Sequence, residues 1–316
     1  MATSSNIKSH MDFIDGNFVG AVVVTYQPES SVLKTTVQSL ISQVSHIYLV
    51  DNTQGGAIEV LEAVLSELNC SNLVTTLIFR ENLGLARAQN EGIKLAITDK
   101  CDFVILSDQD TCFPPGCIKI LLDGFATLQQ ESVKVAALAP AFVNTHNPES
   151  RPYFIRLKGF FAERIFADSG FVEVTQVIAS GQFMPATVFS EVGFMDEQFF
   201  IDWVDTEWCW RARAKGWKIY NCADVVISHT LGDNVKILSG RTYSLRSPVR
   251  HYYIVRNAVI LALYRPVIPW KQRVHAFFRA LRFLIGAPLF TRPRFLHLRH
   301  TLLGFVHGLM NRYGKF

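Results

Sequence analysis

The sequence predicts an α/β protein with a mostly parallel sheet covered by helices on both faces, followed by a basic helical segment. Two observations support this prediction. From residue 19, short β-rich runs alternate with helical patterns for over a hundred residues. After residue 235 there are 15 Lys and Arg residues and no Asp or Glu, whereas all 27 acidic residues precede that point. The 316 residues suffice for one large domain with an appendage.

The first part of the chain contains four short apolar runs that we expect to form strands. Between the runs, apolar residues recur at helical spacing. We expect strands at residues 19–26, 46–52, 73–79 and 103–106, and helices at residues 31–43, 58–68 and 82–98, the last of them capped by Asn82.

The pattern changes after residue 140. Residues 144–175 read as loops, residues 174–180, 217–220 and 225–228 as strands, and residues 202–216 as a segment ending in a helix. In the C-terminal part, prolines are expected to divide the helices: Pro248, Pro266, Pro269, Pro288 and Pro293. We expect a flexible tail at residues 1–16, a large domain at residues 17–235 and a basic amphipathic segment at residues 236–316.

Several protein classes are excluded by what the chain lacks. Six cysteines are too few for a disulfide scaffold in a chain of this length, so we expect reduced thiols, and the absence of a Cys-x-x-Cys pair argues against a structural zinc site. No uncharged apolar run reaches the ~18 residues of a spanning helix. The turn after the first strand lacks the Gly-x-Gly-x-x-Gly pattern of dinucleotide-binding enzymes, and the sequence has no phosphate loop of the Walker type.

Polar residues follow three of the expected strands: Thr25-Tyr26, Asp51-Asn52 and Asp108-Gln109-Asp110. Any one of these could be an ordinary turn. In parallel sheets, however, ligands bind beyond the carboxyl ends of the strands, so the three groups are expected to meet at one crevice.

Two carboxylates at residues 108 and 110 lie on the same face if the chain stays extended there. Paired carboxylates repel each other unless a cation or a shared proton neutralises them. Hard oxygen ligands suit Mg²⁺ or Mn²⁺, particularly when a substrate phosphate also binds the ion. The pair therefore indicates a divalent cation and a nucleoside diphosphate partner.

Several motifs, in their order and spacing, resemble glycosyltransferase family 2. They are Val24-Thr25-Tyr26, Val50-Asp51-Asn52, residues 81–92 (ENLGLARAQNEG), residues 107–111 (SDQDT), residues 193–211 (GFMDEQFFIDWVDTEWCWR) and residues 228–233 (SHTLGD). Residues 108–111 (DQDT), 200–208 and 250–257 (RHYYIVRN) together resemble bacterial rhamnosyltransferases. The resemblance implies a GT-A fold and inverting, metal-dependent transfer of L-rhamnose from dTDP-L-rhamnose to a lipid-linked saccharide, in O-antigen or other surface polysaccharide synthesis.

The resemblance also implies roles for individual residues. Asp205 matches the catalytic base, and Asp110 and His229 match the metal or diphosphate site. The positions matching the nucleotide site are Thr25, Tyr26, Asp51, Arg80, Asn82, Gly84, Arg87 and Asp108. Donor or acceptor sugar contacts fall on Asp202, Trp203, Glu207 and Trp208. The chain departs from the family pattern at Val204, where an acid is usual, and at Asp202, where many members have an aromatic residue.

Structural alternatives exist for these residues. Asp205 could cap a helix in which Glu207 pairs with Arg211 at i,i+4. His229 could be a buried histidine at a strand end, and Trp203 and Trp208 could belong to the core rather than to a sugar site.

The basic C-terminal segment allows two interpretations. Over residues 270–289, apolar side chains follow an i, i+3, i+4, i+7 stripe among basic residues, as in a helix lying on an anionic membrane. Alternatively, the segment packs on the acidic domain or forms a homodimer interface. The sequence has no nucleic-acid recognition motif. We expect a cytoplasmic protein, peripheral on the cytoplasmic face of the inner membrane.

Two other functions remain open at this stage. The same fold could use a UDP- or GDP-hexose donor. A protein of another class, a non-catalytic lipid- or nucleic-acid-binding protein on a degenerate transferase scaffold, is disfavoured by the retained Asp108, Asp110, Asp205 and His229.

Overall fold

The computed structural model describes residues 14, 16–147, 149–229, 234–238 and 241–316. Most of the expected N-terminal tail and residues 230–233 of the last motif lie outside the described residues. Among the described residues, none of the helices combines the length and hydropathy that crossing a membrane requires.

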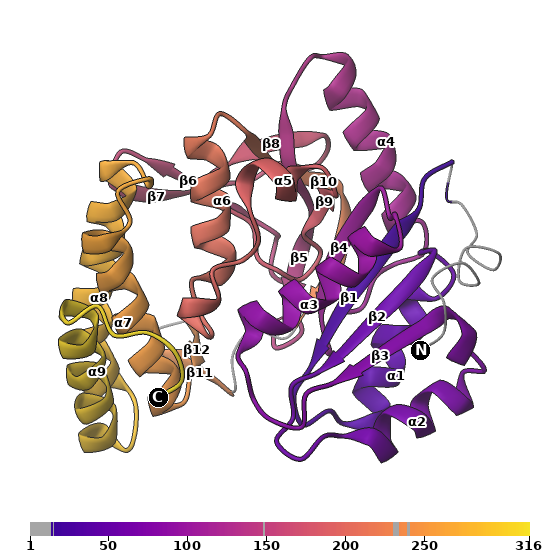
Figure 1. The fold of residues 1–316 in the computed structure, drawn as a ribbon. Coiled ribbons are helices and arrows are strands. Elements are labelled where there is room, and N and C mark those ends of the chain that lie inside the picture. The colour runs from indigo at the N-terminus through magenta and orange to yellow at the C-terminus, as the bar shows by residue number, and fades with distance from the viewer. Residues whose placement is uncertain (1–13, 15, 148, 230–233, 239–240) are drawn as a thin grey trace.

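An eight-stranded sheet forms the centre of the molecule, in the order β3-β2-β1-β4-β9-β5-β10-β8 (Figure 1). The strands β3, β2, β1 and β4 are parallel, as are β5 and β10, whereas β9 and β8 run antiparallel to their neighbours. The bounds are β1 Val19–Thr25, β2 His46–Asp51, β3 Val74–Ile78, β4 Phe103–Asp108, β5 Val135–Asn144, β8 Phe171–Val174, β9 Phe183–Pro185 and β10 Lys218–His229. The mostly parallel α/β fold expected from the sequence is confirmed.

The sheet buries apolar side chains on both faces. In β1, Val19, Ala21 and Val23 belong to one hydrophobic cluster, and Val22 and Val24 belong to the other, because successive side chains of a strand point to opposite faces. The first cluster includes residues from α1 (Ser30–Leu40), α2 (Ile58–Glu67) and α4 (Cys117–Gln130). The second includes residues from α3 (Leu85–Thr98), α5 (Val188–Val192) and α6 (Val204–Ala214). Short 3₁₀ helices lie at Ser71–Leu73 and Glu197–Phe199.

Three expectations about the middle of the chain were wrong. Residues 144–175 contain the hairpin of β6 (Phe154–Lys158) and β7 (Phe161–Ile165) as well as β8, so they are not mainly loop. The strand expected at residues 174–180 ends at Val174. The two strands expected at residues 217–220 and 225–228 form one strand, β10, which begins at Lys218 and whose register against β5 shifts between Cys222 and Val226.

The helix expected to begin at Asn82 begins at Leu85, behind Gly84. Asn82 makes a turn instead, because its Oδ1 accepts a hydrogen bond from the backbone N–H of Gly84 at 3.0 Å. In the C-terminal part, Pro288 lies inside α8 rather than between two helices.

The C-terminal part consists of a small hairpin, β11 (Asn234–Leu238) with β12 (Arg241–Leu245), and then three helices. These helices, α7 (Pro248–Tyr264), α8 (Trp270–Phe290) and α9 (Arg294–Leu309), stand beside the sheet (Figure 1). Residues 251–262 of α7 are all buried. Helix α9 approaches α7 closely, since a Cβ on Gly304 would lie 2.5 Å from the carbonyl oxygen of Tyr252. Helix α7 is therefore the centre of this layer.

Candidate active site

The carboxyl ends of three parallel strands bring the predicted polar groups side by side. Val24 of β1 is in register with Asp108 of β4, and Thr25 with Asp51 of β2. The chain crosses from β1 to β2 on one side, and β4 lies on the other, so this is the switch point at which open α/β sheets bind ligands.

Asp51 is fully buried, and both of its carboxylate oxygens accept hydrogen bonds. Its Oδ1 accepts from the hydroxyls of Thr25 at 2.9 Å and Thr53 at 2.7 Å, and its Oδ2 accepts from the backbone N–H of Ala57 at 2.7 Å. These bonds join the ends of β1 and β2 and hold Thr25 and Asp51 in fixed orientations.

Gln109, the residue between the paired acids, connects the loops after β1 and β4. The backbone N–H of Tyr26 donates to its Oε1 at 2.8 Å, and its Nε2 donates to the Tyr26 carbonyl at 3.2 Å. The Tyr26 side chain is 45% exposed at this edge. The sequence analysis did not predict this role for Gln109; its place between two acids after a strand was the available signal.

The loop before α3 is built on two asparagines. Asn52 Nδ2 donates to Asn82 Oδ1 at 3.1 Å, and Asn52 Oδ1 accepts from the backbone N–H of Leu83 at 2.8 Å. Gly84 has φ of +93°, and a Cβ there would collide with the ring and carbonyl of Phe200. The predicted Arg80 and Arg87 are exposed on either side of this loop.

Asp108, Asp110 and His229 form a cluster whose ligand atoms all lie within 4.8 Å of one another. The His229 ring lies between the two acids, with Nδ1 3.3 Å from Asp110 Oδ1 and Nε2 3.7 Å from Asp108 Oδ2. An isolated antiparallel β-bridge between the backbones of Cys112 and Ser228 holds the end of β10 beside the loop that follows β4. Two carboxylates and an imidazole are a donor set that fits a divalent cation.

The protein compensates part of the charge in this cluster. Burial lowers the pKa of His229, but the hydrogen bond to Asp110 and the charges of both acids outweigh burial and raise the pKa. Ser180 donates a hydrogen bond to Asp108 Oδ2 at 2.6 Å. The predicted metal residues Asp110 and His229, 119 positions apart in sequence, are therefore brought together.

Asp205 lies in the first turn of α6. Its Oδ1 accepts from the backbone N–H of Thr206 at 2.7 Å, and its Oδ2 has no hydrogen-bond partner within the described part of the chain. Burial raises the pKa of Asp205, and the charges of Asp202 and Asp108 raise it further. The N-cap position belongs to Trp203, so Asp205 is not the cap of this helix.

The four side chains predicted to contact sugar are engaged inside the protein. Asp202 forms ion pairs with Arg246 and Arg250. The Glu207 carboxylate accepts hydrogen bonds from Nε and Nη2 of Arg211 at 2.8 and 2.9 Å. The indole N–H groups of Trp203 and Trp208 donate to the carbonyls of Ile254 and Gly193. Both indoles are buried. All four side chains are thus held by contacts within the protein.

Arg279 of α8 is a charged residue near Asp205 that the sequence analysis did not single out. Its guanidinium lies 5.1 Å from the ring centroid of Trp203. Burial and the charges of Arg282 and Arg246 lower its pKa to about 10, whereas Asp205 and Asp202 act in the opposite direction. Its position within an amphipathic stripe offered no signal of this proximity.

The mostly parallel sheet and the acidic cluster at its switch point define a glycosyltransferase of the GT-A type. The family model "Glycosyl transferase family 2" matches residues 21–184, and the chain belongs to this family. The chain is 32% identical over 243 residues to "dTDP-rhamnosyl transferase RfbF" of Shigella flexneri, an alignment that covers 76% of this chain and 78% of that protein. The protein is thus a bacterial rhamnosyltransferase-like member of family 2.

Solved structures share the fold at low identity. They include GalNAc-T7 with UDP, GalNAc and Mn²⁺ (TM-score 0.59, 16% identity, 93% of this chain) and S. aureus TarS 1–349 with UDP-GlcNAc (0.57, 16%, 92%). A third is the mannosyltransferase PcManGT of Pyrobaculum calidifontis with GDP-Man and Mn²⁺ (0.55, 14%, 93%). This chain spans 56%, 81% and 75% of those three chains, respectively.

The ion pairs of Asp202 predict a pH-dependent contribution to stability. Burial raises the pKa of Asp202, but Arg250 and Arg246 outweigh burial and hold the pKa below its ordinary value. At pH 7, Asp202→Asn should lower the free energy of unfolding by about 1–3 kcal/mol, because the two arginines remain partly solvated. Because the pKa of Asp202 is lower in the folded than in the unfolded protein, its ionised carboxylate stabilises the fold at any pH above the unfolded-state pKa of about 3.9. This stabilisation is lost as the pH falls through the folded-state pKa.

Urea unfolding of the wild type and Asp202→Asn from pH 7 to pH 3 measures this difference. The gap between the two proteins should begin to narrow below about pH 4 and narrow further as the pH falls. Asp123→Asn, which changes an exposed carboxylate on α4, is the matched control. A gap that persists unchanged at the lowest pH would contradict the ion-pair explanation.

Proposed function

We propose that this glycosyltransferase moves L-rhamnose from dTDP-L-rhamnose to a hydroxyl of a lipid-linked saccharide, with inversion, during bacterial surface polysaccharide synthesis such as that of an O-antigen. The 32% identity to a dTDP-rhamnosyl transferase supports the donor. The observation that carries the proposal is the cluster of Asp108, Asp110 and His229, whose acid Asp108 is close enough to Asp205 to raise its pKa.

A divalent cation, Mg²⁺ or Mn²⁺, fits the three clustered side chains. Asp110 and His229 would hold it, with Asp108 beside them. When bound, such an ion neutralises the charge that develops on a departing diphosphate. Mn²⁺ named with two of the similar structures supports this assignment.

The nucleotide would lie along the ends of β1 and β2. Thr25, Tyr26 and Asp51 are proposed to hold the base and ribose, since the exposed Tyr26 ring stands beside the rigid Thr25–Asp51 pair. Asp108 would face the ribose side. The loop with Arg80, Asn82, Gly84 and Arg87 would approach the nucleotide, with its two exposed guanidinium groups available to phosphate.

Asp205 is proposed as the general base. Its Oδ2 is available to take the proton of an acceptor hydroxyl, since only Oδ1 is hydrogen-bonded within the described residues. A raised pKa makes the carboxylate a stronger base, and general-base assistance is typically worth about 10²–10⁴-fold in rate.

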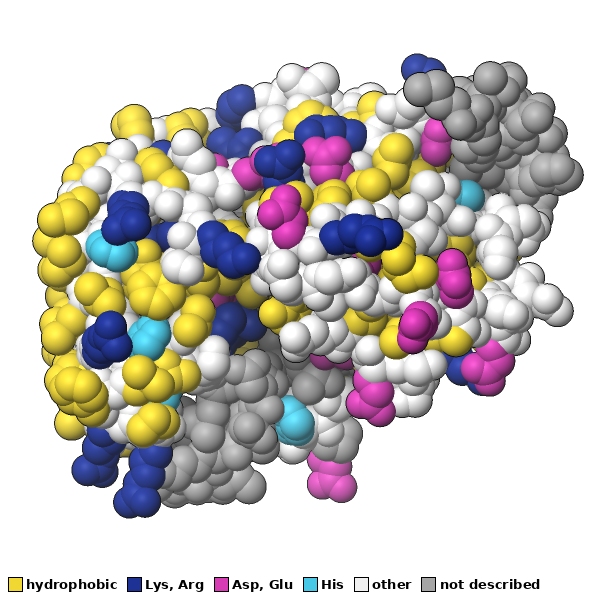
Figure 2. Space-filling view, turned by 60° about the horizontal axis from the view of Figure 1, so that its bottom comes forward, with side chains coloured by type: hydrophobic (Ala, Val, Ile, Leu, Met, Phe, Trp, Pro, Cys, Tyr) yellow, Lys and Arg dark blue, Asp and Glu magenta, His cyan; other side chains and the backbone are white. Residues whose placement is uncertain are grey.

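A membrane partner is supported by the outer surface of α8 and α9. Apolar side chains are exposed there: Phe278, Ile285, Leu289, Phe290, Phe295, Leu302 and Met310. Figure 2 shows hydrophobic side chains gathered over this end of the molecule, with Lys and Arg among them. On α8, Ala276 and Ala280 are buried against the protein, whereas Phe278, Ile285 and Leu289 are exposed. We propose that this apolar-basic surface lies on the cytoplasmic face of the inner membrane.

The function is tested by turnover of dTDP-L-rhamnose, compared with UDP- and GDP-hexoses, with a lipid-linked oligosaccharide acceptor. Asp205→Asn should lower kcat by about 10²–10⁴-fold because it removes the proton acceptor. Its affinity for dTDP should match that of the wild type. Asp123→Asn is the control. Full turnover by Asp205→Asn, or preference for a hexose donor, would contradict the proposal.

Removal of the divalent cation should abolish turnover. After treatment with EDTA, activity should return on addition of Mg²⁺ or Mn²⁺. Asp110→Asn and His229→Ala should raise the half-saturating metal concentration roughly tenfold or more, because each removes a ligand. Unimpaired turnover in excess EDTA would exclude the proposed metal dependence.

Vesicle sedimentation tests the membrane surface. Phe278→Ser with Phe295→Ser, and separately Arg294→Glu with Arg299→Glu, should reduce binding to vesicles containing anionic phospholipid. Each basic residue near such a surface contributes about 1 kcal/mol. Lys100→Glu, an exposed charge reversal next to β4, should bind normally. Equal sedimentation of all variants would refute the membrane assignment.

A further inference from the structure

The segment that leads into Asp205 has an unusual backbone. Phe200, Asp202 and Trp203 have φ angles of +62°, +63° and +68°. Side chains other than glycine rarely adopt this conformation, and each such residue costs of order 1–3 kcal/mol. Three of them within four positions persist only if surrounding contacts hold the segment in place.

Asn257 of α7 supplies the central contacts. Its Nδ2 donates to the carbonyl oxygens of Phe199, Ile201 and Asp202 at 2.9, 2.8 and 2.9 Å. Because an amide nitrogen carries two hydrogens, the three carbonyls share them. The Asn257 side chain is fully buried, so no water competes for these bonds.

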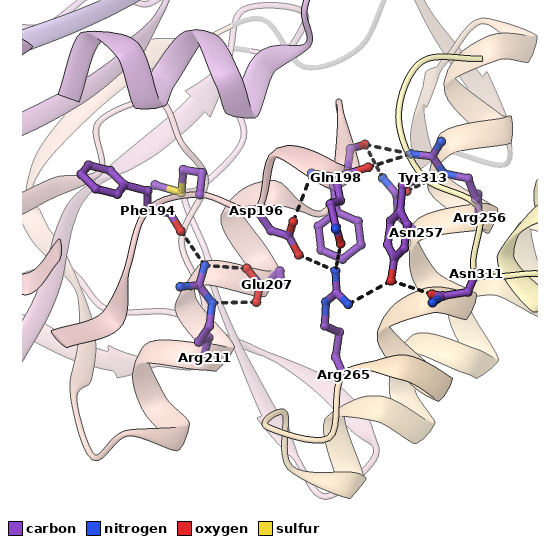
Figure 3. A network of polar contacts seen from close by, with 12 residues as sticks. Phe194, Asp196, Gln198, Glu207, Arg211, Arg256, Asn257, Arg265, Asn311 and Tyr313 are labelled. Atoms are coloured by element: carbon purple, nitrogen blue, oxygen red, sulfur yellow. Dashed lines mark hydrogen bonds and ion pairs between the residues drawn. The ribbon is translucent and has the colours of Figure 1, made fainter. Parts of the chain in front are cut away.

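Arg256 orients Asn257 and binds the same segment. Its Nε donates to Asn257 Oδ1 at 2.9 Å, which turns Nδ2 toward the carbonyls. Its Nη2 donates to the Phe199 carbonyl at 3.1 Å. In Figure 3, Arg256 and Asn257 lie side by side to the right of Gln198, and Arg265, bonded to Asp196, lies below them.

One face of α7 makes the remaining contacts. Arg250, Ile254 and Asn257 are spaced i, i+4 and i+7, so they lie along the same side of the helix. Arg250 binds the Asp202 carboxylate at 2.7 and 2.8 Å, and the Ile254 carbonyl accepts from Trp203 Nε1 at 3.0 Å. From the opposite side, the backbone N–H of Leu85 donates to the Phe200 carbonyl.

We propose that Asn257, oriented by Arg256, is a positioning residue that holds residues 199–203 in their strained conformation and thereby places Asp205 for proton transfer. This inference rests on the proposed role of Asp205 as base. It assigns a function to the RHYYIVRN motif, which otherwise has none. A displacement of about 1 Å in a reacting group can cost about 10²-fold in rate.

The decisive variant is Asn257→Asp. It preserves size and the acceptor for Arg256, but it replaces the N–H donors with an oxygen that repels three carbonyls. We expect kcat to fall about 10²-fold, with the affinity for dTDP and the KM for the donor within twofold of wild type. The control is Asn221→Asp, since Asn221 is also buried and donates to two backbone carbonyls, those of Ala139 and Pro140. The control should lose stability without losing kcat in the folded protein.

A second variant removes another contact by which α7 holds the same segment. Trp203→Phe removes the N–H that donates to the Ile254 carbonyl and keeps an aromatic ring. It is the variant to measure if Asn257→Asp does not fold. Hydrogen exchange of peptides covering residues 198–206 gives a readout independent of activity. Both variants should speed exchange there relative to wild type and to Asn221→Asp, while β1 and β4 stay protected.

Retention of kcat within twofold by a folded variant, or unchanged exchange in residues 198–206, would overturn the positioning role. Failure of the proposed function looks different, because the wild type itself would then turn over no sugar nucleotide. In that case the exchange measurement alone supports or overturns the proposed restraint of the segment by Asn257.

Discussion

Repulsion between carboxylates is the constraint on which this site depends. Asp202 and Asp108 both raise the pKa of Asp205, so several acids lie within electrostatic reach of one another. The negative charge of each acid is compensated in a different way. His229 lies between Asp108 and Asp110, and Asp202 is neutralised by two arginines. Asp205 is the acid without a direct cationic partner among the described residues, and this fits a group whose proton affinity has to be raised.

The opposite charges of the two parts of the chain have a structural explanation. On its inner side the basic C-terminal part supplies cations to acids of the catalytic part, through Arg250 to Asp202 and Arg265 to Asp196. On its outer side, basic residues are interleaved with exposed apolar ones on α8 and α9. Packing on the domain therefore describes the inner face of this segment, and the proposed membrane contact concerns its outer face. These contacts cross the expected boundary at residue 235, so α7 contributes directly to the catalytic scaffold.

Much of the site could be predicted because local chemistry repeats at strand ends. Asp51, Asp108 and Asp110 each follow a buried apolar run, and parallel strands align their ends. The β6–β7 hairpin was missed because its strands are short and partly exposed, with weak alternation. The i,i+4 spacing anticipated the pairing of Glu207 with Arg211, but nothing in the sequence anticipated the arginine partners of Asp202. Arg246 and Arg250 lie over forty residues away from Asp202, and no local pattern reveals such pairs.

The sequence by itself determined the family, the parallel sheet and the residues with chemistry at its edge, because strand periodicity and motif order are local properties. Only the tertiary structure decided which acids are free and which are bonded, since that depends on side chains that meet across long chain separations. It also revealed the strained entry to α6 and the asparagine on α7 that holds it. Backbone angles and buried amide contacts of this kind arise from packing and leave no periodic signal in the chain.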